Sequence, residues 1–313
     1  MDVSSALSLF QTAAELGLIS SLTVLSLCLS YSMLNVCYLS TDGCFTLGAV
    51  VGAMVAASGH PFLSIPAAMC AGILSGFITA FLQTKMGIDS LLAGIIVNTG
   101  LYSINIAVMG NTSLVNLNFT ETIFTKVKAA LESTPFAGQY KLIIAAAAVL
   151  LVVLFLSFFL KTNLGLALRA TGNNPDMVRS SSINTSKIII IGLCISNSFT
   201  ALSGCLLAQS QGSANIDMGT GMVTIALASL LIGGILFSKR KSVAFRAVCA
   251  VLGAVIFRLV YTAALRFNMP AYMLKLVSSV IVIVAISAPY LKKQFPKIKR
   301  RLELRSKKEA DLR

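Results

Sequence analysis

The sequence predicts an all-α membrane protein that crosses the bilayer about nine times. Of its 313 residues, 56% are hydrophobic and 12% are charged, and the mean hydropathy is +0.86. Soluble domains carry about 25% charged residues. The hydrophobic stretches follow one another along the chain, and each approaches the roughly 20 residues that a helix needs to cross a bilayer. Membrane β-barrels instead show alternating segments of about 10 residues, a pattern that this sequence lacks.

In the first half of the chain, a short hydrophobic stretch at 44–58 contains Gly48 and Gly52 and is a candidate half-helix. The turn at His60-Pro61 separates it from the next stretch. The polar region 110–140 is mixed in charge, and its lack of a basic excess indicates the outside of the cell. The hydrophobic stretches expected in this half are 15–38, 44–58, 62–83, 88–108 and 142–160.

The second half begins with the polar loop 161–187 and contains a glycine-rich break, QGSANIDMGTG, at 211–221. Its expected stretches are 188–209, 222–237, 243–265 and 272–290. The total is therefore about nine, with a range of roughly eight to ten because the piece 44–58 is short for a full crossing. We expect residues 1–291 to form one membrane domain and 292–313 a basic tail.

Basic residues indicate the orientation of the chain. The net charge is +14, and ten of the 25 basic residues lie in the segment 292–313. The loop 161–187 carries Lys161, Arg169, Arg179 and Lys187 against a single acid, Asp176. Lys and Arg near span ends are retained in the cytoplasm, so we expect a cytoplasmic loop, a cytoplasmic C-terminus and an N-terminus outside. These charges also favour anionic lipid headgroups. No aromatic residues interleave with them, which excludes nucleic acid as a partner.

The residues offer no catalytic or metal chemistry. The seven cysteines form no CxxC pair and lie mostly in apolar stretches, and His60 is the only histidine. We expect neither disulfides nor a metal site. No GxxxxGK pattern occurs, so the chain should not hydrolyse ATP itself. No nucleophile–base pair or pair of catalytic carboxylates stands out, and we predict that the chain is not an enzyme and has no catalytic residues.

Within the loop 161–187, Asn174-Pro175-Asp176 has the chemistry of a helix start. Asn174 can cap, Pro175 suits the first helical position, and Asp176 favours the positive end of the helix dipole. We expect two short helices around a turn at Gly172-Asn173. Such a basic, helical loop is either an element that docks a partner or a solvated connection.

Two acid-and-glycine breaks suggest a path through the membrane. Thr41-Asp42-Gly43 and Asp217-Met218-Gly219 each precede a short apolar segment. Broken helices at matching places in two halves mark the pathway of many transporters. We therefore expect two pseudo-symmetric halves with broken helices, and Asp42 and Asp217 as candidate residues of a translocation path.

Arg258 and Asn98 are the other candidates for this path. Arg258 lies well inside an apolar stretch, where a charge must face protein or water. It either lines the path, where it would suit a substrate carboxylate, or has a structural role by snorkelling or pairing with an acid such as Asp42, Asp89 or Asp217. Asn98 either lines the path or hydrogen-bonds to a neighbouring helix.

Four stretches carry a resemblance to a known family. They are LGLALRATGNNPDMVRSSSINTSK (164–187), SNSFTALSGCLLAQSQGSANIDMGTGMVTIALASLLIGG (196–234), LLAGIIVNTGLYSINIAVMG (91–110) and FRLVYTAALRFNMPAYMLKLVSS (257–279). The first two resemble the permease subunits of bacterial ABC importers of the branched-chain amino-acid and ribose type. The last two resemble the subgroup associated with tryptophan, tyrosine or unassigned substrates.

The resemblance implies a plasma-membrane permease that works with other chains. These are a second copy as a homodimer, ABC ATPase subunits that bind ATP and Mg²⁺, and an extracytoplasmic substrate-binding (lipo)protein. It maps the family's coupling helix onto residues 170–182 with Gly172 at its turn. The implied coupling residues are Ala170, Thr171, Gly172, Asn173, Asn174, Pro175, Asp176, Met177 and Arg179.

The cargo implied by the resemblance is a small solute, with an amino acid, an aromatic one such as tryptophan above all, favoured. A nucleoside, a sugar or another small molecule is the alternative within the importer class. A secondary transporter or channel, or a structural membrane subunit, is the alternative outside it.

Overall fold

The computed structural model describes residues 3–34, 39–118, 120–131, 137–236, 243–266, 276, 278–284 and 287, and it is helical almost throughout. The helices are α1 (Val3–Leu27), α2 (Thr41–Ala57), α3 (Ser64–Lys85), α4 (Ser90–Val108), α5 (Ile123–Leu131), α6 (Tyr140–Phe159), α7 (Asn163–Asn173), α8 (Pro175–Ser180), α9 (Thr185–Gln211), α10 (Met222–Leu236) and α11 (Val243–Arg266). A π-helical segment η1 (Cys28–Met33) continues α1, and a 3₁₀ turn η2 (Ala137–Gln139) precedes α6.

Six of the described helices are long and apolar enough to cross a membrane, namely α1, α3, α4, α6, α9 and α11, and α2 and α10 are shorter apolar helices. The prediction of an all-α, polytopic membrane protein is thereby confirmed. The count of about nine stays a prediction. Most of the expected last span 272–290 and the whole basic tail 292–313 lie outside the described residues.

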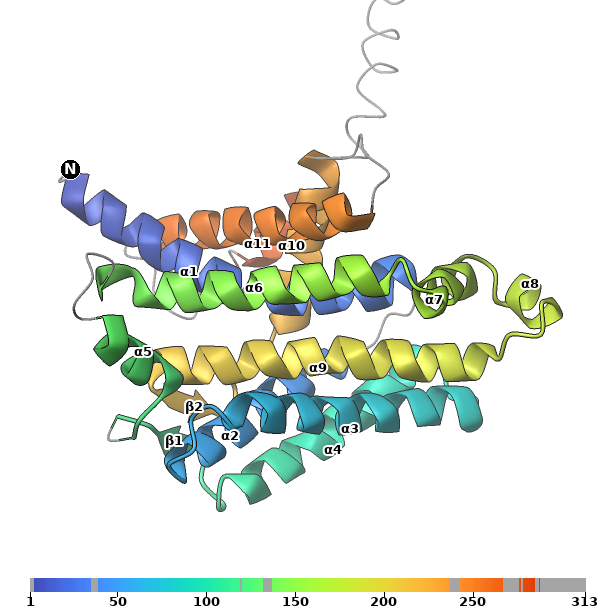
Figure 1. Ribbon diagram of the computed structural model, residues 1–313, viewed down its shortest axis with the longest axis horizontal. Helices are drawn as coiled ribbons and strands as arrows, with labels where there is room; N and C mark the ends of the chain where they lie inside the picture. The colour runs from blue at the N-terminus through green and yellow to red at the C-terminus, as the bar shows by residue number, and fades with distance from the viewer. Residues whose placement is uncertain are drawn as a thin grey trace, which may run out of the picture.

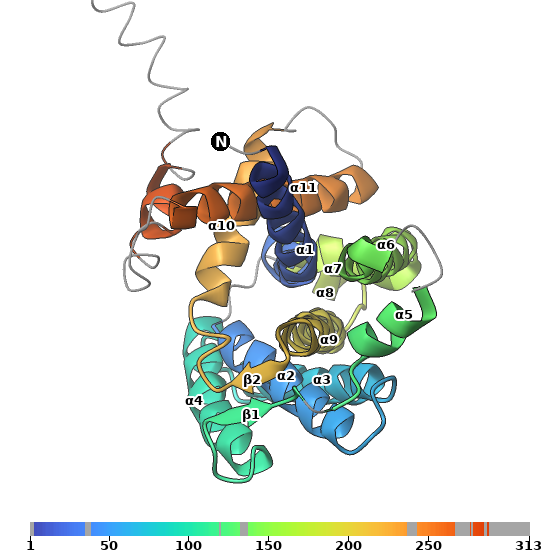
Figure 2. The ribbon, with the colours of Figure 1, turned by 90° about the vertical axis from the view of Figure 1, so that its left-hand side faces the viewer.

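Two helices form the core. In α1 and α9, 72% of the most apolar window is buried, against 28–33% in the other four spans. Figure 2, which looks along the long helices, places α9 at the centre, with α2 and α3 on one side and α1 and α6 on the other. The remaining spans direct much of their surface outward, as a bilayer requires.

Glycines allow the helices around α9 to approach closely. A β-carbon on Gly48 would collide with the backbone of Ala201, and one on Gly72 would collide with Asn197 and Ala201. Gly76 lies in the same way against Leu193 and Cys194. In lipid, no hydrophobic effect drives helices together. Small residues let the backbones approach closely, and the resulting van der Waals packing holds the helices together.

These contacts also define the depth at which each helix begins. In α3, Gly72 and Gly76 face Asn197 and Leu193, so α3 runs antiparallel to α9. Helix α2 runs parallel to α9 but starts beside its middle, where the Cys44 thiol contacts the carbonyl of Asn197 at 3.3 Å. The expected half-helix is therefore present. It begins at Thr41, so that Asp42 and Gly43 lie in its first turn and not in a break before it.

At one end of the bundle the chain forms a small sheet that the sequence analysis did not predict. Strand β1 (Leu114–Asn116) pairs antiparallel with β2 (Ser213–Asn215) in the register Leu114↔Asn215, Val115↔Ala214 and Asn116↔Ser213. The region 110–140, expected to be a polar connection, thus contains a strand and the helix α5. Helices α7 and α8 project from the opposite end (Figure 1).

Helix α10 runs across the long axis of the other helices. It leaves the layer of α2 and α4 next to β2 and reaches α11 (Figures 1 and 2). Gly233 in α10 lies against Cys249 in α11, and Gly253 in α11 lies against Ser229 in α10. This helix therefore bridges the two sides of the bundle.

Candidate functional site

The projecting pair α7–α8 is built by two side-chain caps. The hydroxyl of Thr162 accepts a hydrogen bond from the Gly165 backbone at 3.3 Å and starts α7 directly after α6. The Asn174 side chain accepts from the backbones of Asp176 and Met177 at 3.2 and 3.1 Å and starts α8. The predicted cap at Asn174 and the predicted first helical position of Pro175 are confirmed.

The turn between these helices lies at Asn174, so the prediction of a turn at Gly172-Asn173 is wrong. Both residues belong to the last turn of α7. A β-carbon on Gly172 would overlap the carbonyl oxygen of Met33 and approach Leu34. Gly172 is therefore needed because α7 packs closely on the end of η1. It has a helical conformation and does not form a turn.

Most of the predicted coupling residues lie on the surface of this projection. The exposed ones are Ala170, Asn173, Asn174, Pro175, Asp176, Met177 and Arg179. Thr171 is buried and Gly172 is half-buried, so they face the bundle. Val178 anchors α8 from within, and Arg179 donates from Nε to the hydroxyl of Thr185 at 3.2 Å. Because Thr185 begins α9, α8 is tied to the core helix.

A polar pocket lies at the depth where α2 begins. Its volume is about 200 Å³, and it is lined by Asp42, Gly43, Thr46, Asn98, Tyr102, Asn105, Ile216, Asp217 and Thr220. These residues come from α2, α4 and the turn between β2 and α10. The pocket thus brings together three of the four predicted path residues, Asp42, Asn98 and Asp217.

Asp42 has a structural task at this pocket. Its two carboxylate oxygens accept hydrogen bonds from the backbones of Gly221 and Val223, both at 2.9 Å. These N–H groups belong to the start of α10, where helices leave donors unpaired and carry a positive partial charge. Asp42 in one short helix therefore caps the other. Close by, Gly219 packs against the Asp42 carbonyl, and its N–H donates to the hydroxyl of Thr46 at 3.2 Å.

Tyr102 and Asn105 are pocket residues that the sequence analysis missed. Asn98, Tyr102 and Asn105 are separated by four and three residues, so they lie on one face of α4. This spacing was the available signal. Asn105 is 1% exposed, and its Nδ2 donates to the carbonyl of Gly43 at 3.3 Å.

Arg258 lies elsewhere. It is in α11, its Nε donates to the hydroxyl of Ser20 in α1 at 3.3 Å, and its guanidinium lies 5.8 Å from the ring centre of Tyr261. Among the described residues it forms no ion pair with Asp42, Asp89 or Asp217. It does not line the polar pocket, and its role in a path stays a prediction.

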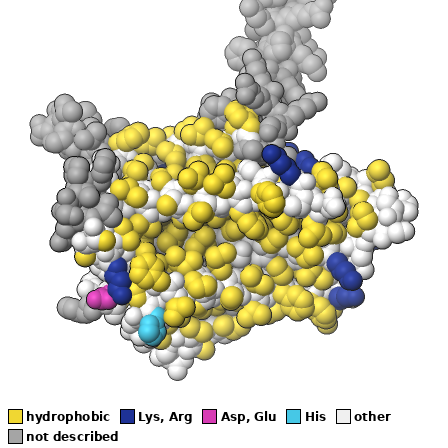
Figure 3. Space-filling model, in the orientation of Figure 1, with side chains coloured by type: hydrophobic (Ala, Val, Ile, Leu, Met, Phe, Trp, Pro, Cys, Tyr) yellow, Lys and Arg dark blue, Asp and Glu magenta, His cyan; other side chains and the backbone are white. Residues whose placement is uncertain are grey.

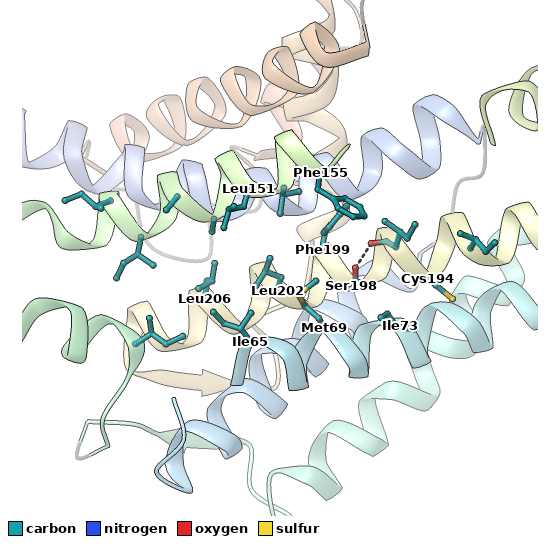
Figure 4. Close-up of a pocket in the computed structure, with 18 of the residues that line it drawn as sticks. Ile65, Met69, Ile73, Leu151, Phe155, Cys194, Ser198, Phe199, Leu202 and Leu206 are labelled. Atoms are coloured by element: carbon teal, nitrogen blue, oxygen red, sulfur yellow. Dashed lines mark hydrogen bonds between the residues drawn. The ribbon is translucent and has the colours of Figure 1, made fainter. Parts of the chain in front are cut away.

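The outer surface of the bundle is apolar. In Figure 3 hydrophobic side chains cover much of the visible face, and the charged side chains in view lie at its margins. A groove of about 920 Å³ runs between α3, α5, α6 and α9. Figure 4 shows its lining, including Met69, Phe155 and Leu202. Ser198 also lines it, but its hydroxyl donates to Ile195 of the same helix at 2.7 Å.

Comparison with known proteins places the chain among permeases. The family model described as branched-chain amino acid transport system / permease component matches residues 9–286. A tyrosine transport system permease protein of Clostridioides difficile is 31% identical over 298 residues, which cover 94% of this chain and 96% of the relative.

Sugar importers are also similar to this chain. A ribose import permease protein of Escherichia coli is 24% identical over 241 residues, covering 76% of this chain and 72% of the relative. A galactose/methyl galactoside import permease protein of Haemophilus influenzae is 25% identical over 221 residues, covering 71% and 63%. No solved structure gives a significant match. Since the family model spans most of the 313 residues, the chain belongs to the family of permease components of branched-chain amino acid transport systems.

Proposed function

We propose that this permease is the membrane subunit of an ATP-driven importer and that α7–α8 docks into a separate ATPase. The observation that carries the proposal is the projection itself. It is a pair of capped helices that extends beyond the spans, with Met177 66% exposed at its surface. Both helices start at side-chain caps, and α8 is tied to α9 by the hydrogen bond from Arg179 to Thr185, so the pair presents a positioned surface to a partner beyond the spans. ATP and Mg²⁺ would be bound by the partner, because the chain carries no P-loop.

Contacts connect this projection to the polar pocket. A displacement of α8 would reach α9 through Val178 and the hydrogen bond from Arg179 to Thr185. Helix α9 contacts α2 through Gly48 and Ala201 without intervening side chains, so the two move together. The start of α2 forms one wall of the pocket and caps α10. ATP-driven motion at one end would thereby change the pocket halfway along the bundle.

The α7–α8 end is proposed to be cytoplasmic. It carries Lys161, Arg169, Arg179 and Lys187 near span ends, where basic residues are retained on the cytoplasmic side. The opposite end, with the β1–β2 sheet, would face a substrate-binding protein outside. A second copy of the chain would complete the path as a homodimer.

An amino acid is the proposed cargo, with an aromatic one favoured. Support comes from the relative named as a tyrosine permease, which covers this chain nearly end to end. A sugar is the second candidate, because a ribose permease is similar over 76% of the chain and a galactose permease over 71%. Nucleosides and other small solutes, and transport without an ATPase, are supported by no relative named here.

Substitution of Met177 tests the docking proposal. Met177→Glu places a charge on α8, and we expect the reconstituted complex to lose most ATP-dependent tyrosine uptake while the permease stays in the membrane at its normal level. Met86→Glu is the matched control. Met86 is 64% exposed and lies at the same end, after Lys85 at the close of α3, but outside α7–α8.

Co-purification with the ATPase and uptake into proteoliposomes are measured for both variants. Loss of ATPase binding by Met177→Glu alone supports docking through α8. Equal uptake by the two variants, or substrate flux by the permease without any ATPase, would contradict the proposal.

A further inference from the structure

We propose that the polar pocket binds the ammonium group of the transported solute, so that the permease itself selects amines and amino acids against sugars and carboxylates. This inference rests on the proposed function, because it assumes that the pocket belongs to the translocation path. It concerns the pocket lined by Asp42, Asn98, Tyr102, Asn105 and Asp217. Among the residues that the structure describes, no Lys, Arg or His side chain lines it.

The first observation is an unused acceptor in the pocket wall. Asn105 is 1% exposed, and its Oδ1 has no hydrogen-bond partner among the described residues. The opposite amide orientation would place this oxygen against the Gly43 carbonyl, so the bond from Nδ2 to Gly43 decides the assignment. A buried acceptor without a donor costs about 1–3 kcal/mol. This oxygen is covered in the observed structure, so a ligand that brings an N–H or O–H group removes this cost when the pocket wall shifts to expose it.

The second observation is that the threonine hydroxyl protons around the pocket are already used. Thr46 donates to the Asp42 carbonyl at 3.1 Å, and Thr220 donates to the Asp217 carbonyl at 2.6 Å. The neighbouring backbone donors of Gly221 and Val223 are held by the Asp42 carboxylate. Among the described lining residues, donors remain on the Asn98 amide and the Tyr102 hydroxyl, whereas the Asp217 carboxylate and the Asn105 oxygen accept. A negatively charged ligand such as a carboxylate would meet the Asp217 charge and is matched less well than a cation.

The third observation is an uncompensated negative charge. The Asp42 carboxylate faces the positive end of α10, which offsets its charge. Asp217 also lines the pocket, and within the described residues its carboxylate forms no ion pair. Asp217 is exposed at this pocket, and its negative charge favours a cation over an anion there. An ammonium group supplies both the positive charge and the donors.

Tyr102 completes the cation-binding chemistry. Its side chain lines the same pocket and is 52% exposed. The face of a tyrosine ring attracts cations, by about 0.5–2 kcal/mol depending on solvation. Ligand pockets for whole drug-sized molecules measure about 300–1,000 Å³. The observed volume of about 200 Å³ suits the charged end of an amino acid and leaves its side chain outside the pocket.

The experiment uses the absence of tryptophan from the chain. Tyr102→Trp in the full-length permease in lipid nanodiscs provides a single fluorescent reporter that retains an aromatic face. The fluorescence of this tryptophan is excited at a wavelength that tyrosine does not absorb, and it is followed while one of four probes is added. The probes are tyrosine, tyramine, p-hydroxyphenylpropionate and ribose. Tyramine keeps the ammonium group of tyrosine and lacks its carboxylate, whereas p-hydroxyphenylpropionate keeps the carboxylate and lacks the ammonium group. We expect tyrosine and tyramine to bind at least about tenfold more tightly than the other two.

Further substitutions in the Tyr102→Trp permease test which residues recognise the ammonium group. Asp217→Asn and Asn105→Leu should each weaken tyramine binding about tenfold. Glu121→Gln removes one charge at an exposed site outside the pocket and should change nothing. Equal binding of tyramine and p-hydroxyphenylpropionate, or preferential binding of ribose, would overturn the inference.

Failure of this inference is distinguishable from failure of the proposed function. The titration needs neither ATP nor an ATPase, so selective tyramine binding without any coupled uptake would refute only the importer. Coupled uptake that is sensitive to Met177→Glu, together with unselective binding at Tyr102→Trp, would refute only the ammonium site.

Discussion

At the scale of single residues, Asp42 joins two parts of the chain that are far apart in sequence. Its carboxylate accepts from Gly221 and Val223, which lie 179 and 181 residues away. The same side chain lines the polar pocket. A change in the position of α10 therefore changes the charge distribution at the pocket, and this couples the bridge helix to the site.

Removal of this cap should destabilise the protein. Asp42→Ala leaves the first N–H groups of α10 without acceptors, and we expect a loss of about 1–2 kcal/mol and a lower midpoint of thermal unfolding in nanodiscs. Asp42→Asn keeps one acceptor oxygen and should fall between Asp42→Ala and the unmodified chain.

Asp217→Ala provides the control for loss of a pocket carboxylate, because no backbone donor of a helix start depends on its side chain among the described contacts. A midpoint for Asp42→Ala that equals that of Asp217→Ala would contradict the capping role.

At the scale of elements, α7–α8 is held against the bundle by a backbone contact. Gly172 lies on the Met33 carbonyl at the end of η1, and Leu34 is adjacent. Near this contact, Gly192 of α9 faces the side chains of Leu34 and Leu168. The projection therefore packs on the end of the first span as well as on α9, and the proposed coupling would require this firm attachment.

Substitution of Gly172 by alanine tests this contact between α7 and η1. In Gly172→Ala the new β-carbon would overlap the Met33 carbonyl, so α7 must shift, at a cost of about 1–3 kcal/mol. We expect faster amide hydrogen exchange across 163–180 and reduced ATP-dependent uptake.

Gly100→Ala is the matched control, because a β-carbon there meets nothing within 4 Å and alanine favours a helix by up to about 1 kcal/mol. Unchanged exchange in Gly172→Ala would mean that α7 does not depend on this contact.

At the scale of the whole molecule, the bundle has two different ends and a polar level between them. One end carries α7–α8 and the start of α9, and the other carries the β1–β2 sheet and α5 (Figure 1). The pocket lies at the level where α2 and α10 begin. A central site between two differentiated ends is the arrangement that alternating access requires.

Cysteine labelling tests which end faces the cytoplasm. Ser58 and Ser181 are exposed at opposite ends, after α2 and after α8. A membrane-impermeant maleimide should label Ser58→Cys in intact cells and Ser181→Cys only in inverted vesicles. The unmodified chain, whose exposed Cys70 lies within the span α3, should stay unlabelled in both. The reverse pattern would contradict the proposed orientation.

The sequence by itself determined what depends on near neighbours along the chain. Apolar length and composition predicted the spans, and the residue types at 174–176 predicted the start of α8, because capping involves atoms two or three residues apart. Glycine alone did not decide the turn. Gly172 was expected there, yet its partner Met33 is distant in sequence and could not be inferred from local patterns.

Only the tertiary structure decided how the polar residues within the spans are combined. Asp42, Asn98 and Asp217 meet in one pocket, whereas Arg258 binds Ser20 on another side of the bundle. The pairing of β1 with β2 joins residues about a hundred positions apart and was not predicted. The physical reason is the same in each case. In a bilayer every buried polar group needs a partner, but the sequence does not state which distant group provides it, and the packing of small residues around α9 makes that choice.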